Sequence, residues 1–409
     1  MNLCNMLRGN FYSTLLKIVF AMKVYIGILF IILSSCVSKQ SFDDKYSLEL
    51  TGNYCEFRID DDTRIPLFNL YVIEEGGVEY LTFSNSENRT ILIYNMSGDL
   101  LTKVAFESEG PNGIGMNLFG YYIKDFQHIY IPNANRSVIY ETDTTGIVKK
   151  VLDYSKLVDG TLTVPAYYTN HDDRQMFFVN NSLFIPQPLN RTLGSESWIE
   201  SSPTAVWFDT INKQTEKFPM LHPHDKISSK EYNQFIADLS YSSVLKDGKL
   251  IYSFTMEDEL YLIDIKGEVI EKKQAKSRYV QNVSPRRLPN DFLSVVKETC
   301  EMPSYGNIMY DEYRKVYYRF VYPETELETG LNYRKILHNG KKEFSIIIMD
   351  ESFNIIGETK FPPFTYVPHI CFINEEGLFL CTSHFMREDY SDDWLRFQRI
   401  DLVEKLQKQ

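Results

Sequence analysis

The residues best suited to chemistry in this 409-residue chain are its histidines, because their rings bind metals and exchange protons near neutral pH. Only His222-Pro223-His224-Asp225 groups any of the seven histidines in the sequence. Two histidines and an aspartate could ligate a divalent metal, but no third or fourth ligand follows at a recognised zinc spacing. The segment therefore has two interpretations: a metal site at His222 and His224, or an extended, solvated loop.

Motifs for a nucleophile or a cofactor are absent from the sequence. It contains no Gly-x-Ser-x-Gly elbow, no glycine-rich dinucleotide turn and no phosphate-binding loop. The glycine-rich segment 110–115 includes Pro111, which lacks the N–H that a phosphate would need. We therefore predict no cofactor. Catalysis by paired carboxylates stays open, because folding can bring such residues together from distant segments.

Aromatic side chains in predicted loops offer a binding surface. The chain has 28 Tyr and 27 Phe but only 3 Trp. Flat rings beside polar groups suit sugars or peptides, which makes four tyrosines candidate ligand contacts: Tyr167, Tyr168, Tyr305 and Tyr366. The alternative is that these rings pack between strands, since aromatic residues also favour pleated, half-buried surfaces.

The net charge argues against one class of partner. The chain has 43 basic and 55 acidic side chains, which gives a formal net charge of −12. A surface of this sign repels a phosphate backbone, and the sequence has no basic stripe with interleaved aromatics. We therefore expect no binding of nucleic acid.

The N-terminal segment predicts export and a lipid anchor. Lys23 precedes an apolar run over residues 24–33, which is shorter than the roughly 20 residues of a membrane-spanning helix. The run ends in Leu33-Ser34-Ser35-Cys36, which resembles a bacterial lipobox. This resemblance implies that Cys36 carries a lipid. The protein would then lie in the cell envelope, anchored to the outer membrane and facing the periplasm or the cell surface.

This interpretation divides the beginning of the chain into two parts. Residues 1–36 are the expected signal peptide and lipobox, with Met22 as an alternative start, and residues 37–45 are the expected tether. An uncleaved membrane anchor over about residues 15–33 is the other interpretation.

Four cysteines follow the lipobox: Cys55, Cys300, Cys371 and Cys381. An oxidising compartment permits disulfides, and four thiols allow three pairings. Cys371 and Cys381 flank a predicted turn and could face each other across a hairpin. The alternative is four buried free thiols that behave as small hydrophobic side chains.

A strand-turn-strand unit recurs along the mature chain. Each copy has an apolar strand, an Asn or Asp, a short polar turn with Gly or Asn, and a second strand. The copies lie at residues 91–101, 138–148, 205–212, 260–270 and 346–356. Gly and Asn suit such turns because they tolerate positive φ. A further strand precedes each hairpin, and residues 377–382 and 394–402 make a sixth unit.

Six units of short strands predict an all-β fold, a six-bladed β-propeller over residues 46–405. A blade cannot bury its face alone, so the ring must close. The extra strand Tyr46–Ile59 is expected to complete the last blade and latch the two ends. Residues 230–239 are expected to form one short helix in a connection between blades.

The chain resembles the six-bladed, TolB-like propeller lipoproteins of the Bacteroides group, many of which are domains of unknown function. The residues that carry the resemblance are the lipobox, Glu109-Gly110-Pro111-Asn112-Gly113, and the segment 310–320. It covers about residues 22–405 and implies the fold and an envelope location. It implies no activity, because this group has no established activity to transfer.

Together these features predict a lipid-anchored envelope protein that binds a glycan, a peptide or another envelope protein, or that serves as a scaffold. The sequence favours this role over an enzyme. The alternative is a glycan-acting hydrolase or lyase with its site in the propeller channel. That alternative requires carboxylates, His or Tyr from several blades to converge.

Overall fold

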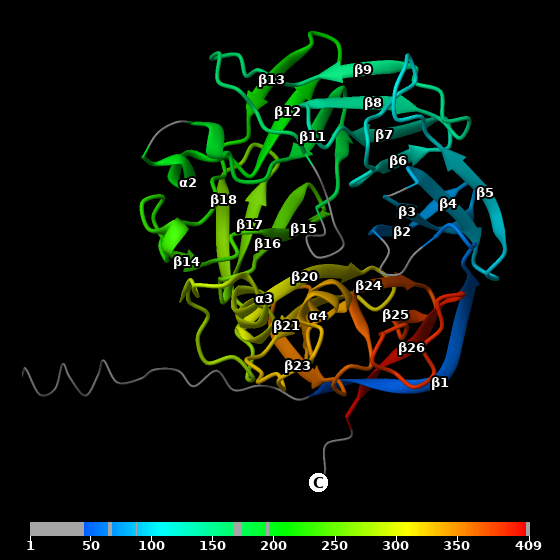
Figure 1. Cartoon of the computed structure of the whole chain (residues 1–409), viewed down its shortest axis with the longest axis vertical. Coiled ribbons are helices and arrows are strands. Elements are labelled where there is room, and N and C mark those ends of the chain that lie inside the picture. The colour runs from blue at the N-terminus through cyan, green and yellow to red at the C-terminus, as the bar shows by residue number, and fades with distance from the viewer. Residues whose placement is uncertain (1–44, 64–67, 87, 167–173, 194–195, 406–409) are drawn as a thin grey trace, which may run out of the picture. The chain divides into compact units, whose positions relative to one another are not determined.

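The computed structural model describes residues 45–63, 68–86, 88–166, 174–193 and 196–405. These residues belong to one compact unit and form six four-stranded antiparallel sheets arranged in a ring (Figure 1). The predicted all-β, six-bladed propeller is confirmed. No helix in the described part of the chain is long and apolar enough to cross a membrane.

The first three sheets follow one another along the chain. The first comprises β2 (Phe68–Glu75), β3 (Val78–Asn85), β4 (Thr90–Asn95) and β5 (Leu100–Ala105). The second comprises β6 (Tyr122–Asp125), β7 (His128–Pro132), β8 (Val138–Thr142) and β9 (Lys150–Asp153). The third comprises β10 (Phe177–Val179), β11 (Ser182–Pro186), β12 (Ala205–Asp209) and β13 (Gln214–Lys217).

Three further sheets complete the ring. The fourth comprises β15 (Tyr241–Lys246), β16 (Lys249–Phe254), β17 (Glu259–Asp264) and β18 (Val269–Gln274). The fifth comprises β20 (Ser304–Asp311), β21 (Val316–Tyr322), β22 (Ser345–Asp350) and β23 (Ile355–Lys360). The sixth comprises β24 (Val367–Asn374), β25 (Gly377–Cys381), β26 (Trp394–Glu404) and β1 (Tyr46–Arg58).

The ring closes through the sixth sheet. Strand β1, from the start of the described chain, pairs antiparallel with β26, so that Tyr46 lies opposite Glu404 and Arg58 lies opposite Trp394. In Figure 1 the blue β1 runs beside the red β26. The predicted latch is therefore confirmed, and it gives the last sheet its fourth strand.

Each sheet is a meander, so its connections alternate between two edges. We call the edge with the first-to-second and third-to-fourth strand connections the turn edge, and the opposite one the loop edge. Turn-edge connections are tight. In the β17–β18 turn, Asp264 Oδ1 accepts hydrogen bonds from the amides of Lys266 and Glu268, both at 2.9 Å. Asn95 and Asp350 accept equivalent bonds in the first and fifth sheets. The Asn or Asp that recurs in the sequence repeat is therefore a turn-forming residue.

The loop edge carries the long connections and the described helices, α2 (Trp198–Ser201), α3 (Phe292–Glu301) and α4 (Tyr333–Asn339). It also holds the two-stranded ladder of β14 (Phe235–Ile236) and β19 (Arg286–Arg287) and two 3-10 turns, Arg191–Leu193 and Tyr232–Gln234. A helix was predicted over residues 230–239, but only Tyr232–Gln234 form a 3-10 turn there. The rest of the prediction is wrong, because the chain extends at Phe235 to pair with Arg287.

The side chains between the sheets are mainly apolar. One cluster joins the sixth and first sheets around Phe57, Leu92 and Phe397, and similar clusters lie at other seams. The four described cysteines are free thiols, three of them buried. The hairpin register places Cys371 opposite Leu380 and Cys381 opposite Val367, so this hairpin does not bring the two thiols face to face.

Candidate functional site

A cavity of about 850 Å³ opens at the loop edge of the second to fifth sheets. Its walls come from loop-edge connections and from the first residues of β20, including segments 188–191, 236–240 and 337–341. This volume lies within the range of about 300–1,000 Å³ that is usual for small-molecule sites. The wall is mainly apolar, and its apolar residues include Val164, Leu189, Ile236, Leu239, Met256 and Met302.

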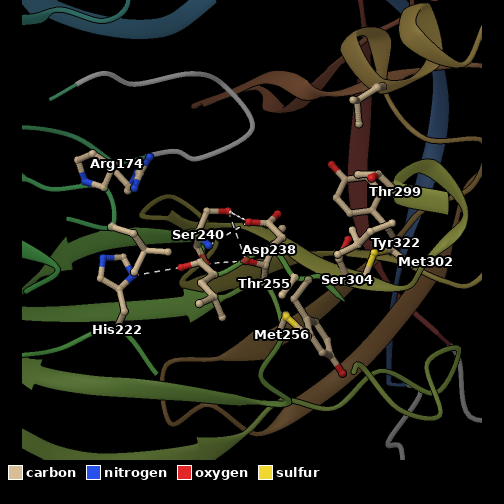
Figure 2. Close-up of a pocket in the computed structure, with 18 of the residues that line it drawn as sticks. Arg174, His222, Asp238, Ser240, Thr255, Met256, Thr299, Met302, Ser304 and Tyr322 are labelled. Atoms are coloured by element: carbon tan, nitrogen blue, oxygen red, sulfur yellow. Dashed lines mark hydrogen bonds between the residues drawn. The ribbon is translucent and has the colours of Figure 1, made fainter. Parts of the chain in front are cut away.

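One end of the cavity holds Arg174 and His222, which Figure 2 shows side by side. The Arg174 side chain is 3% exposed, and its guanidinium carbon lies 4.9 Å from the centre of the Tyr241 ring. His222 Nδ1 lies 3.1 Å from the carbonyl oxygen of Leu239. Burial lowers the pKa of His222 to about 4, so at neutral pH the positive charge at this end comes from Arg174.

The other end of the cavity holds Lys341, just after α4. Its Nζ donates hydrogen bonds to the carbonyl oxygen of Met302 at 2.7 Å and to Ser304 Oγ at 3.2 Å. Met302 is the C-cap of α3, so the ammonium group lies at the negative end of that helix. Burial lowers the pKa of Lys341 to about 8. Figure 2 shows Met302 and Ser304 well apart from Arg174.

The rim adds a third cation. The exposed Arg191 guanidinium lies over the rings of Trp198 and Tyr232, at 5.4 and 4.9 Å from the ring centres. The described lining includes one carboxylate, the exposed Asp238, which accepts hydrogen bonds from the amide and hydroxyl of Ser240. The cavity therefore has a positive lining in a chain with a net charge of −12.

The central channel is a second, smaller cavity of about 440 Å³, lined by the innermost strands of the sheets. Its polar lining includes Tyr71, Tyr122, Asn307 and His369. Among the described residues, no Asp or Glu lines it. An adjoining cavity of about 240 Å³ shares Tyr71 and Tyr122 with the channel and is lined by three carboxylates, those of Glu74, Glu75 and Asp125.

Two predicted ligand contacts are core residues. Tyr305 begins the inner strand β20, is 0% exposed and borders the cavity, and its hydroxyl donates to Asp258 Oδ1 at 2.7 Å. Tyr366 is buried between the fifth and sixth sheets, where its hydroxyl donates to Gln398 Oε1 at 2.6 Å. Both rings are therefore buried, and Tyr305 is the one of the two that borders the cavity. Tyr167, Tyr168 and Cys36 lie outside the described residues.

The two candidate metal ligands are not joined by a third. The ring nitrogens of His222 face the carbonyl oxygens of Leu239 and Gln187, and His224 Nδ1 lies 3.2 Å from the His222 carbonyl oxygen. No group of three or more His, Cys, Asp or Glu that could hold a metal occurs in the described part of the chain.

Arg174 and Lys341 were missed by the sequence reasoning. Arg174 comes before the inner strand of the third sheet, and Lys341 follows a short helix inserted in the fifth sheet. No motif or spacing in the sequence connects them, because they are 167 positions apart. The one available signal was the presence of basic residues inside the long connections between predicted strands.

The segment 310–320, which carries the family resemblance, packs on both neighbouring sheets: Tyr318 and Phe320 face the sixth sheet, and Arg319 lies at the seam with the fourth. Arg319 is 0% exposed, and its guanidinium donates to Ser253 Oγ at 2.9 Å and to the carbonyl oxygens of Ala275 at 3.0 Å and Glu257 at 2.6 Å. The same group lies 3.8 Å from the centre of the Tyr305 ring. This part of the resemblance is therefore structural.

Comparison with protein families identifies this architecture. Residues 47–360 match the model of a family described as Domain of unknown function (DUF4221). The chain belongs to the DUF4221 family. The match spans most of the ring, and the cavity wall up to Lys341 lies within it.

Two solved structures are similar to the chain. One is a DUF4221 member from Bacteroides vulgatus, with 23% sequence identity and a TM-score of 0.78 over 89% of this chain and all of that one. The other is described as a candidate exported protein from Bacteroides fragilis, with 11% identity and a TM-score of 0.50 over 90% of this chain and 98% of that one. These likenesses show the propeller fold. Comparison with curated proteins found no match.

Proposed function

We propose that this DUF4221 protein is a lipid-anchored protein of the cell envelope whose ligand occupies the loop-edge cavity. The observation that carries the proposal is the cavity of about 850 Å³, with apolar walls and cationic groups from separate connections. Such a combination is typical of a ligand site, because apolar walls supply affinity and a few polar groups fix orientation. A glycan, a peptide or a segment of another envelope protein are the candidate ligands.

The envelope location rests on the sequence and on one relative. The lipobox-like segment ending at Cys36 supports a lipid anchor in the outer membrane, and a structural relative is described as a candidate exported protein. Strand β1 begins at Tyr46, opposite the last residue of β26, and therefore at the turn edge. The described chain therefore begins at the edge opposite the cavity.

A thermal-shift screen tests the binding role. Residues 37–409 contain the whole closed ring with its own core, and they are screened against oligosaccharides, peptides and small organic acids. A ligand at about 100 times its Kd adds roughly 2.7 kcal/mol to the free energy of unfolding. The variant Ala237→Trp fills the cavity from its wall and is expected to abolish the shift. A shift that persists in this variant places the ligand elsewhere, and no shift with any ligand contradicts a small-ligand role.

The contact between Lys341 and Ser304 favours one alternative, a hydrolase that uses a serine nucleophile. A lysine with a lowered pKa can accept the proton of a neighbouring serine hydroxyl, which then attacks a carbonyl. The screened ligands are therefore also assayed for turnover. Turnover that Ser304→Ala abolishes while ligand binding remains would support the hydrolase, and binding without turnover would support the binding protein.

A further inference from the structure

We propose that the cavity takes an apolar molecule that carries a carboxylate, with the carboxylate at Lys341 and Ser304. This inference rests on the proposed function and names the chemical class of its ligand. Three basic side chains, Arg174, Arg191 and Lys341, and one carboxylate lie in the described lining, so at neutral pH the charge of the cavity is opposite to that of the whole chain. The low dielectric constant of an apolar cavity strengthens the attraction between these cations and an anion.

The Lys341 end has the geometry of an anion site. The ammonium group has three donors, and the hydrogen bonds to Met302 and Ser304 use two of them. Ser304 is a buried residue, and its hydroxyl can rotate to donate a second hydrogen bond to the same carboxylate. The side chains of Thr299 and Tyr322 also line this end of the cavity.

The walls favour a ligand with an apolar body. Leu239, Met256 and Met302 are buried residues that border the cavity, Leu239 beside His222 and Met302 beside Lys341. Methionine adapts its shape to different apolar partners, so these side chains can pack against an apolar body of variable shape. Arg174, at the other end, offers a place for a second polar group of a longer ligand.

Isothermal titration with three small probes tests this inference on residues 37–409. Octanoate has an apolar chain and a carboxylate, 1-octanol has the chain alone, and glucuronate has the carboxylate on a sugar. We expect octanoate to bind at least tenfold more tightly than the other two. Equal binding of octanol would remove the role of charge. Tighter binding of glucuronate would overturn the inference and keep the proposed function, and binding of none of the three would contradict both.

Substitutions locate the carboxylate. Lys341→Met is expected to weaken octanoate binding at least tenfold and to leave octanol binding unchanged, whereas Lys341→Arg keeps octanoate affinity within about threefold. The matched control is Lys266→Met, which removes the same charge from an exposed turn at the turn edge. If Lys266→Met weakens octanoate as much as Lys341→Met does, the effect is one of net charge and the assigned site is wrong. A loss in Lys341→Met with an unchanged circular dichroism spectrum excludes misfolding as its cause.

Discussion

The seam at Arg319 and the cavity at Lys341 each place a basic side chain against the fifth sheet, but they use it differently. Arg319 is fully buried and directs its donors at Ser253 and at carbonyl oxygens of the fourth sheet and its connections. Lys341 makes two hydrogen bonds at the end of α3 and borders an open volume. The Arg319 guanidinium joins two blades, whereas the Lys341 ammonium group keeps one N–H donor for a ligand.

This difference between Arg319 and Lys341 gives a criterion for telling structural charges from functional ones in this fold: whether the hydrogen-bond partners of the charge all lie within the protein. A buried cation costs free energy unless hydrogen bonds compensate it, and the carbonyl oxygens around Arg319 supply that compensation within the protein. At the cavity, Lys341 makes two hydrogen bonds and also borders an open volume. Burial lowers the pKa of both groups, to about 10 for Arg319 and to about 8 for Lys341, so the contacts and not the pKa values distinguish them. Substitutions at the seam should therefore affect stability, and substitutions at the cavity should affect binding.

The largest expected effect is at the seam. Arg319→Met leaves Ser253 Oγ and several buried carbonyl oxygens without their donor, so we expect a loss of about 3–5 kcal/mol in the free energy of unfolding. Urea denaturation measures this loss. Octanoate affinity of the folded fraction should stay within twofold of the parent protein. Unchanged stability would show that the guanidinium is not needed at the seam.

Two buried histidines should make the protein sensitive to acid, because burial disfavours their protonated form in the folded chain. Arg319, by contrast, stays charged although it is buried. The pKa of His222 and that of His384 are both lowered to about 4, mainly by burial, from 6.5. The unfolded chain therefore binds more protons between pH 6.5 and 4, and stability is lost as the pH falls through this window. Each histidine contributes on the order of 3 kcal/mol to that loss.

The variant His222→Gln isolates one of these contributions. Glutamine can still donate a hydrogen bond to the Leu239 carbonyl oxygen but does not titrate. Denaturation curves between pH 4 and 7 should then show a shallower pH dependence than in the parent protein. An identical slope in both proteins would mean that His222 is protonated equally in the folded and unfolded chains.

Tyr305 lies where the seam at Arg319 meets the cavity, so its substitution tests which of the two regions it belongs to. Its hydroxyl donates to Asp258 at 2.7 Å and accepts from the Ser277 amide at 3.2 Å, although the ring borders the cavity. Tyr305→Phe should lower the free energy of unfolding by about 1–3 kcal/mol and leave octanoate affinity unchanged. Weaker binding with unchanged stability would reverse this assignment and support the sequence prediction of a ligand contact.

The pH dependence of binding should report the charge of Lys341. Its pKa of about 8 in the free protein means that affinity for octanoate is constant between about pH 6.5 and 7 and falls by up to tenfold per pH unit above 8. The neighbouring Cys300 thiol has its pKa raised to about 11 by burial and stays protonated over this range. Lys341→Arg should remove the dependence, and a dependence that persists in this variant would assign it to another group.

The smallest expected effect is the stability of Lys341→Met. The substitution removes two hydrogen bonds, but it also removes a partly desolvated charge, so the free energy of unfolding should change by less than about 1 kcal/mol. Thermal denaturation of this variant beside Arg319→Met compares the two regions directly. A loss as large as that of Arg319→Met would make Lys341 part of the structural framework.

The turn edge was predictable from the sequence because its information is local. Residues such as Asp264 and Gly267 specify a tight turn within four positions, and the predicted hairpins agree with the strands around them. The closing strand was predictable for a related reason, since an unpaired apolar strand must find a partner in the ring. The helices α3 and α4 were not predicted, because both are short and lie in insertions that the repeat does not constrain.

The sequence by itself determined a β-propeller with six blades, a latch between its ends and a negative net charge, because turn chemistry, strand alternation and composition act over short distances. The tertiary structure alone decided that Tyr305 and Tyr366 are buried, that the described cysteines stay free, and that Arg174 and Lys341 face one cavity. These outcomes depend on how separate connections meet at the loop edge, and ring closure sets those distances.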